Sequence, residues 1–125
     1  MSTGVVPTFV NSMNSPPEPL YMYSVMRICA TAGVTTIEYE PGLLQDLPAL
    51  CEKLAPRGVT YHHDATWHDG NGYAHLLAAL FKPSLSIPMT DGEPILGTWQ
   101  QVILADFDNR PRQRKLVIQV MGESD

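Results

Sequence analysis

The sequence contains few cysteines, a modest share of charged residues and no long apolar run. Two of its 125 residues are cysteine, and 17% are charged. Two cysteines cannot supply the disulfide framework of a small secreted domain, and no segment approaches the roughly 18 to 20 apolar residues of a transmembrane helix. The N-terminus also lacks a basic segment followed by a long apolar one. These absences predict a cytoplasmic protein with no membrane partner.

Basic residues are scarcer than acidic ones. Eight Lys and Arg stand against 13 Asp and Glu, which gives a formal net charge of -5. Nonspecific nucleic-acid binding needs clustered basic residues that neutralise phosphates, so no nucleic-acid partner is expected. One short stretch does gather Arg110, Arg112, Arg114 and Lys115. Such a stretch either receives a phosphate or keeps a β-hairpin soluble, and we favour the hairpin because charged turns between strands are common.

The length of the chain suits a single domain with one hydrophobic core. Residues 11–19 read NSMNSPPEP, a segment rich in Ser, Asn and Pro with no apolar period. This composition predicts a flexible N-terminal segment over residues 1–19 and one folded domain over residues 20–125.

Helix-like patterns interrupt the strand-like ones only in the middle of the chain. Residues 20–29 and 34–40 predict two strands joined by a small-residue turn, as a hairpin or a tight corner. Residues 43–54 predict a helix with Asp46 as its cap, which would place Pro48 in the first turn. A second helix is expected after Asn71 and Gly72, with Tyr73, Leu76, Leu77 and Leu80 on one face.

Three further strands are predicted at residues 85–89, 95–107 and 115–121. Over part of its length the middle strand is apolar at both odd and even positions, which suits a strand covered on both faces. The sequence therefore predicts an α+β fold, a two-sheet β-sandwich with two to three short helices inserted mid-chain.

All four histidines lie within residues 61–75, beside Asp64 and Asp69. Imidazole is the commonest zinc-binding side chain, and a carboxylate can fix its tautomer. The spacing predicts a metal site, but a polar loop with surface histidines explains it equally well. Asp69, Gly70, Asn71 and Gly72 open a helix whose free backbone donors would attract a phosphate, although an ordinary helix cap has the same sequence.

Several separated motifs occur in one order along the chain: VTTIEYEPGLLQDLP (34–48), YHHDATWHDGNGYAHLLAAL (61–80), PSLSIP (83–88), LGTWQQ (96–101) and DFDNRPRQR (106–114). In this order they resemble the secondary thiamine-phosphate synthase family, over about residues 30–123. The resemblance implies a small α+β domain that assembles as a homotrimer with sites near the subunit boundaries.

The resemblance also implies functional residues. It assigns His63 and His75 to a metal and, together with Glu38, to catalysis. Cys29 stands where the family has a histidine, so it is the candidate third ligand. The implied substrate-binding residues are Asn71, Gly72, Trp99, Gln100 and Arg110. For Trp99 alone, core packing is the favoured alternative.

The function implied is a metal-dependent enzyme that joins a pyrimidine diphosphate to a thiazole phosphate and releases pyrophosphate, with zinc or magnesium as the divalent ion. The alternative is a noncatalytic trimeric domain that binds a structural metal or a small phosphorylated ligand, including an inactive, truncated family member. Three protein ligands with an open position would favour catalysis, and four would favour a structural metal.

Overall fold

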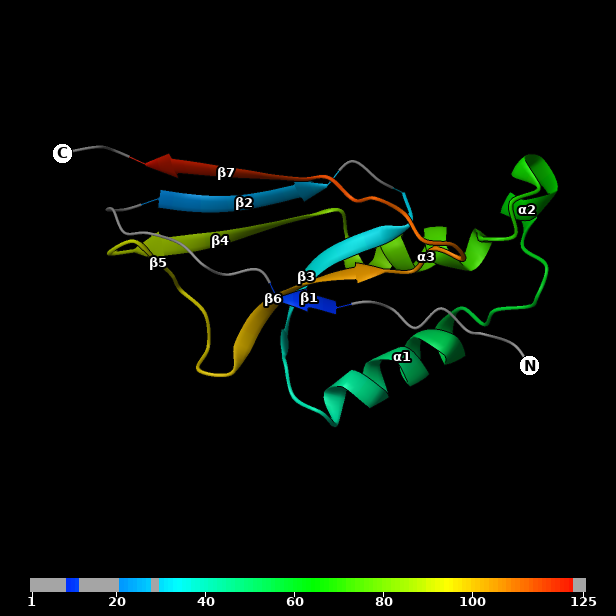
Figure 1. Ribbon diagram of the computed structural model, residues 1–125, viewed down its shortest axis with the longest axis horizontal. Coiled ribbons are helices and arrows are strands. Elements are labelled where there is room, and N and C mark those ends of the chain that lie inside the picture. Colours follow the sequence, from blue (N-terminus) through cyan, green and yellow to red (C-terminus); the bar gives the residue numbers. More distant parts are fainter. Residues whose placement is uncertain (1–8, 12–20, 28–29, 123–125) are drawn as a thin grey trace.

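The computed structural model describes residues 9–11, 21–27 and 30–122 (Figure 1). Helices are inserted in the middle of this part, between strands. The elements in chain order are β1 (Phe9–Asn11), β2 (Tyr21–Arg27), β3 (Ala32–Glu38), α1 (Leu43–Leu54), α2 (His62–Trp67), α3 (Gly72–Phe81), β4 (Ser84–Thr90), β5 (Glu93–Pro94), β6 (Gln100–Asp106) and β7 (Leu116–Gly122).

The strands form two antiparallel sheets, with the orders β1-β6-β3 and β5-β4-β2-β7. The first is built on the pairing of β3 with β6, which runs from Ala32 opposite Asp106 to Glu38 opposite Gln100. Because β2 and β3 belong to different sheets, the chain turns a corner between them and makes no hairpin there. The same holds for β6 and β7, so the hairpin expected around the basic stretch is wrong.

Strand β6 is covered on both faces, as its apolar pattern predicts. Ile103 and Ala105 pack with Phe107 against α1 and α3, while Val102 packs with Val34 and Ile87 between the two sheets. The alternation follows from the two-residue period of a strand, in which successive side chains point to opposite faces. The predicted α+β class, with two sheets and short mid-chain helices, is confirmed.

Gly33 allows the end of α3 to lie directly on β3. A Cβ atom added at Gly33 would lie 2.4 Å from the Cβ of Phe81 and 3.0 Å from the carbonyl oxygen of Lys82. Val34, which follows Gly33, donates its backbone N–H to the Lys82 carbonyl oxygen at 3.0 Å. Close approach of two backbones is a common reason for glycine within a strand.

The start of α1 differs from the prediction. Helix α1 begins at Leu43, and the carboxylate of Glu40 accepts the backbone N–H groups of Gly42 and Leu43. Asp46 is therefore not the cap, and Pro48 lies inside the helix. Glu40 was missed because two residues separate its side chain from the first helical residue, and sequence patterns expect a cap immediately before the helix.

Two other elements also depart from the predictions. The expected strand at residues 95–107 starts only at Gln100, and the short β5 precedes it. In α3 the buried residues include Ala74 and Ala78, whereas Leu76 and Leu80 are exposed. Tyr73 and Leu77 of the predicted face are buried as well, so only part of that face is wrong. The buried face is rotated toward the alanines, whose small side chains permit a close approach of the helix to the sheet.

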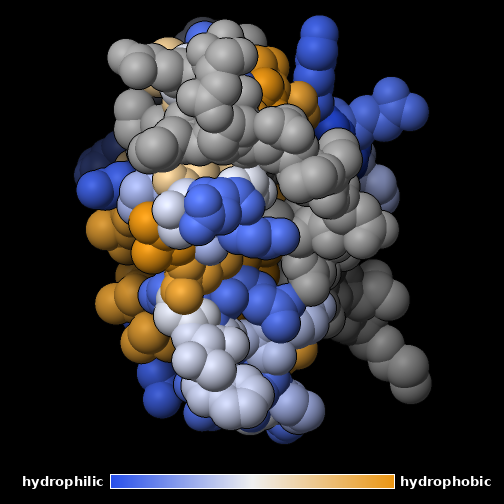
Figure 2. Space-filling view, turned by 90° about the vertical axis from the view of Figure 1, so that its left-hand side faces the viewer, coloured by the Kyte–Doolittle hydropathy of each residue, from blue (hydrophilic) through white to orange (hydrophobic). Residues whose placement is uncertain are grey.

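Apolar side chains also reach the surface on β7, the edge strand of the four-stranded sheet. Ile118 and Val120 of β7 are about half exposed there. Figure 2 looks onto the left-hand side of Figure 1 and shows apolar patches between hydrophilic ones. No helix within the described residues is long and apolar enough to span a bilayer.

Part of the N-terminal segment has a defined place. Phe9–Asn11 forms β1, which pairs with β6 from Phe9 opposite Ala105 to Asn11 opposite Ile103. This strand covers one edge of the three-stranded sheet. The rest of the segment over residues 1–19, for which flexibility is expected, lies outside the described residues, as does Cys29.

Candidate metal centre

Two histidines from different helices meet at the centre of the candidate site. His63 belongs to α2 and His75 to α3, and their ring centroids lie 4.0 Å apart with the ring planes at 35°. Asp69 comes from the loop between these helices, and its Oδ1 lies 3.8 Å from Nε2 of His63. One donor atom from each of the three residues lies within 4.8 Å of the other two. One cation can therefore contact all three side chains.

The carboxylate of Asp64 sets the relation between the two helices. One of its oxygens accepts the backbone N–H of Tyr61 at 3.2 Å, just before α2. The other accepts the backbone N–H of Gly72 at 3.0 Å, at the start of α3. A carboxylate is favourable near the positive end of a helix dipole, and this one serves two such ends. Asp64 therefore ties the helix that carries His63 to the helix that carries His75.

Asp69 is held by two asparagines. With its amide oriented so that the nitrogen faces Asp69, Asn71 donates to both carboxylate oxygens at 3.0 Å. Asn109 donates from Nδ2 to the backbone carbonyl of Asp69 at 2.8 Å. The carboxylate and the loop that carries it are thus fixed independently of each other.

The imidazole of His63 has a buried nitrogen with unmet hydrogen-bonding capacity. Its Nε2 is inaccessible to solvent and has no hydrogen-bond partner. A buried polar atom without a partner costs about 1–3 kcal/mol, and a bound cation would remove that cost. The chemistry of the donor set therefore fits a metal ion.

The electrostatics at His75 also suit a metal ligand. Burial lowers the pKa of His75, and the neighbouring His63 lowers it further, while Asp69, Asp108 and Asp64 oppose the shift. A lowered pKa keeps the imidazole neutral near pH 7. Neutral imidazole is the form that binds metal ions.

Two imidazoles and one carboxylate form an incomplete coordination shell. A tetrahedral or octahedral ion would keep at least one position for water or another ligand. Among the residues that the structure describes, no further His, Cys, Asp or Glu belongs to this group. The third ligand suggested by the sequence, Cys29, lies outside the described residues, so its part stays a prediction.

Glu38, Trp99 and Gln100 lie away from the histidines within one chain. Glu38 pairs with Gln100 at one end of the β3–β6 ladder, whereas Asp108, which lies near enough to His75 to influence its pKa, follows the other end of β6. Seven residues of strand separate these ends by about 20 Å. Trp99 is 71% exposed, so the core-packing alternative for this residue is wrong.

The start of α3 offers little to an anion. The Gly72 N–H that was expected to attract phosphate donates to Asp64. Gly72 is buried, and a Cβ added there would lie 2.5 Å from the Cβ of Tyr61. Arg110 is exposed and follows Asn109, so it belongs to a loop beside the site. Its contact with a substrate stays a prediction.

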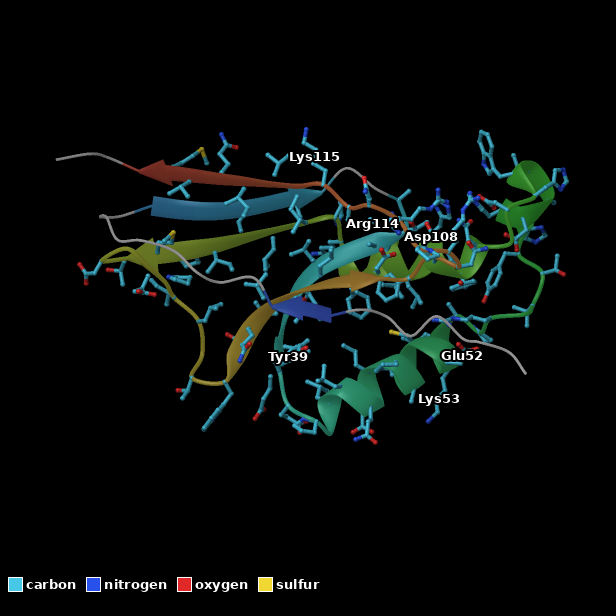
Figure 3. All side chains as sticks on the ribbon, viewed as in Figure 1. Tyr39, Glu52, Lys53, Asp108, Arg114 and Lys115 are labelled. Atoms are coloured by element: carbon cyan, nitrogen blue, oxygen red, sulfur yellow. The ribbon has the colours of Figure 1, made fainter. Side chains whose placement is uncertain are left out.

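Part of the basic stretch is neutralised within the protein. Arg112 forms an ion pair with Asp108 at 2.9 Å, and Arg114 pairs with both Asp108 and Asp106. Figure 3 shows Arg114 and Asp108 side by side near the start of β3. Thr31 donates to the same Asp108 oxygen at 2.9 Å. The sequence offered two roles for this stretch, a phosphate site or a solvated hairpin. Arg112 and Arg114 have neither role, because both form ion pairs with aspartates of the same chain. In DFDNRPRQR two aspartates and then three arginines occupy every second position, and this pattern was the available sequence signal for the ion pairs.

Comparison with known proteins identifies the family. A family model described as UPF0047 protein YjbQ-like matches residues 22–123. The chain belongs to the UPF0047 family. A UPF0047 protein of Archaeoglobus fulgidus is 38% identical over 91 residues, which are 73% of this chain and 70% of that protein. One of Mycobacterium tuberculosis is 42% identical over 85 residues, which are 67% and 65%. The alignments thus span about two thirds of these relatives.

Solved structures agree with the UPF0047 assignment. A hypothetical protein of Aeropyrum pernix has a TM-score of 0.77 at 30% identity and covers 84% of this chain and 76% of its own. An uncharacterised YjbQ/UPF0047 protein of Clostridium acetobutylicum has a TM-score of 0.74 at 26% identity, over 94% and 100%. Both names leave the activity open.

These matches correct the family resemblance drawn from the sequence motifs. The assignment to the secondary thiamine-phosphate synthases is wrong, because the matching family model and the named relatives are UPF0047 proteins. The transferase reaction and the zinc ion that came with that assignment have no support from these relatives. The small α+β domain that the motifs also implied is present, because a shared order of motifs indicates a shared fold more directly than a shared reaction.

Proposed function

We propose that this UPF0047 protein is a binding domain in which His63, Asp69 and His75 hold a divalent cation. The ion would present its remaining coordination positions to a small phosphorylated ligand. The observation that carries the proposal is the convergence of donor atoms from three side chains within 4.8 Å, where one of the residues, His63, has a buried Nε2 with no hydrogen-bond partner.

The charges around the site favour a cation over a free anion. Asp64 and Asp69 flank the two imidazoles, and Asp108 lies near enough to influence the pKa of His75. A phosphate placed there alone would meet like charges at short range, which is unfavourable. A divalent ion reverses the local charge and can then bind a phosphate oxygen directly. Ligand binding should therefore depend on the metal.

The test is a titration of metal-stripped protein by isothermal calorimetry. Mg²⁺, Mn²⁺, Co²⁺ and Zn²⁺ are compared, and we expect one ion per chain for at least one of them. His63→Ala, Asp69→Ala and His75→Ala each remove a ligand, so each should weaken binding by more than the roughly 10- to 100-fold that loss of a group orienting a ligand costs. The matched control is His62→Ala, because His62 is exposed on the same helix beside His63.

A second titration adds inorganic phosphate to the stripped and the metal-loaded protein. Phosphate should bind only when the metal is present. If none of the four ions binds, or if the three ligand variants match His62→Ala, the proposed function is wrong. If the metal binds but phosphate does not, the metal centre stands and the phosphorylated ligand is excluded.

The homotrimer also remains a proposal. Apolar residues at about half exposure on β7 would gain from cover by a second copy. Light scattering of the purified protein measures the mass, and a trimer would show three times the 13.8 kDa of one chain.

A further inference from the structure

We infer that Asn71 is a positioning residue of the cation site, which orients the carboxylate of Asp69 and anchors the helix that carries His75. The inference rests on the proposed function, because it assigns Asn71 a task toward the cation. Asn71 is 2% exposed, so its side chain reaches other protein groups far more readily than a ligand in solution.

The side chain of Asn71 is directed at Asp69. Its amide nitrogen donates to both carboxylate oxygens, each at 3.0 Å. A shared donor of this kind fixes the plane of the carboxylate, and with it the lone pair that faces His63. The distance of 3.8 Å between Asp69 Oδ1 and His63 Nε2 is longer than a hydrogen bond and leaves these two atoms free to approach a common ion.

Helix capping does not account for this orientation. Asn71 is the N-cap residue of α3, and asparagine at that position usually accepts a backbone N–H through its side-chain oxygen. Here the side chain makes no capping hydrogen bond. The residue therefore gives up the stabilisation of a cap and holds Asp69 instead.

The backbone of Asn71 serves the second ligand. Its carbonyl oxygen accepts the N–H of Ala74 at 2.8 Å and that of His75 at 3.4 Å. One residue thus connects two of the three donors, Asp69 through its side chain and His75 through its main chain. Groups that orient metal ligands typically change metal affinity by about 10- to 100-fold when they are removed.

The experiment compares Asn71→Ala and Asn71→Ser with the wild-type protein in Co²⁺ titrations followed by visible absorption. Serine caps a helix about as well as asparagine, but it is too short to reach Asp69. We expect both variants to lose about 10- to 100-fold in Co²⁺ affinity and to change the shape of the Co²⁺ absorption bands. Asn71→Ser also removes both hydrogen bonds to the Asp69 carboxylate, so the metal-free variant should be less stable than the wild type but still unfold in one cooperative transition.

A metal-free measurement tests the contact separately. In NMR spectra of the stripped protein, the Asn71 side-chain amide protons should be shifted and slow to exchange. Both properties should be lost in Asp69→Ala. If Asp69→Ala leaves these protons unchanged, the inference is overturned whether or not a metal binds.

The outcomes separate the two proposals. If the wild-type protein binds Co²⁺ and Asn71→Ser matches it in affinity and spectrum, Asn71 only starts the helix, and the inference fails while the metal centre stands. If the wild-type protein binds neither Co²⁺ nor any other ion tested, the metal centre fails and takes the positioning role with it. Loss of affinity in both variants with an altered spectrum supports both proposals.

Discussion

Asp64 and Gly72, eight residues apart, are joined by a 3.0 Å hydrogen bond from the Gly72 backbone N–H to the Asp64 carboxylate. The other oxygen of the same carboxylate accepts the N–H of Tyr61. One side chain therefore sets both the start of α2 and its position relative to α3. The distance between His63 and His75 depends on this link, although Asp64 is not among the three donors of the site.

Asp64→Asn tests the link. An asparagine keeps one acceptor oxygen and turns an NH₂ group toward a backbone donor, which leaves that donor without a partner. We expect a loss of about 1–3 kcal/mol in the free energy of unfolding of the metal-free protein, measured with urea. Metal affinity should fall as well, because the two helices are no longer held in register.

The control for this variant is Asp91→Asn. Asp91 is exposed in a turn at φ 50°, a conformation that asparagine adopts readily. Its replacement should change neither stability nor metal binding. Unchanged stability in Asp64→Asn would show that the capping carboxylate contributes nothing to the arrangement of α2 and α3.

Gly33→Ala should destabilise the fold at the contact between α3 and β3. The new methyl group would lie 2.4 Å from the Phe81 Cβ and 3.0 Å from a backbone oxygen, so the helix end must move. Overpacking of this kind costs about 1–3 kcal/mol, which urea unfolding would measure. Gly97→Ala is the control, because its methyl group would meet only the side chain of Gln100, no closer than 3.2 Å. Equal stability of the two variants would contradict the packing described for Gly33.

Local patterns predicted those elements whose periodicity is strong. The strand covered on both faces and the helix after Asn71 follow from apolar spacing, and both are present at β6 and α3. Helix α2 was missed because it is six residues long and has no apolar face. Its only sequence signal was Asp64 at the third helical position, which closes a capping box with Tyr61.

Long-range contacts could not be predicted in the same way. The histidine window pointed to His63 and His75, but the sequence did not show that Asp69 would join them. It also did not reveal that Asp108 would pair with Thr31, 77 residues earlier. Such contacts depend on which strands pair and where the chain turns a corner, and neither follows from local spacing.

Asp108 should make stability depend on pH in the acid range. Burial raises the pKa of this carboxyl, but hydrogen bonds from Thr31, Arg112 and the Asn109 backbone, with the charge of Arg112, outweigh burial and lower it. The unfolded carboxyl, with its ordinary pKa of 3.8, then binds protons more readily than the folded one. Its contribution is fully present above the unfolded pKa and is lost as pH falls through the folded pKa.

Urea unfolding at a series of pH values below 5 checks this prediction. Asp108→Asn should be less stable than the wild type near pH 7, by about 3 kcal/mol, because it leaves Arg114 without one partner. The difference should shrink as pH falls. His75, whose pKa is also lowered, is present in both proteins, so its titration cancels in the difference between them. A difference that stays constant with pH would show that the Asp108 carboxyl does not titrate as described.

The two tryptophans can report where the cation binds. Trp67 lies on α2 with His63 and is 69% exposed, whereas Trp99 lies just before β6, at the end of the sheet away from the histidines. Paramagnetic Co²⁺ quenches tryptophan fluorescence at short range. Trp99→Phe should therefore keep the quenching seen in the wild type, and Trp67→Phe should lose it. Both side chains are exposed, so each variant should fold normally. Quenching of Trp99 as strong as that of Trp67, or stronger, would contradict a cation held by His63, Asp69 and His75 of the same chain.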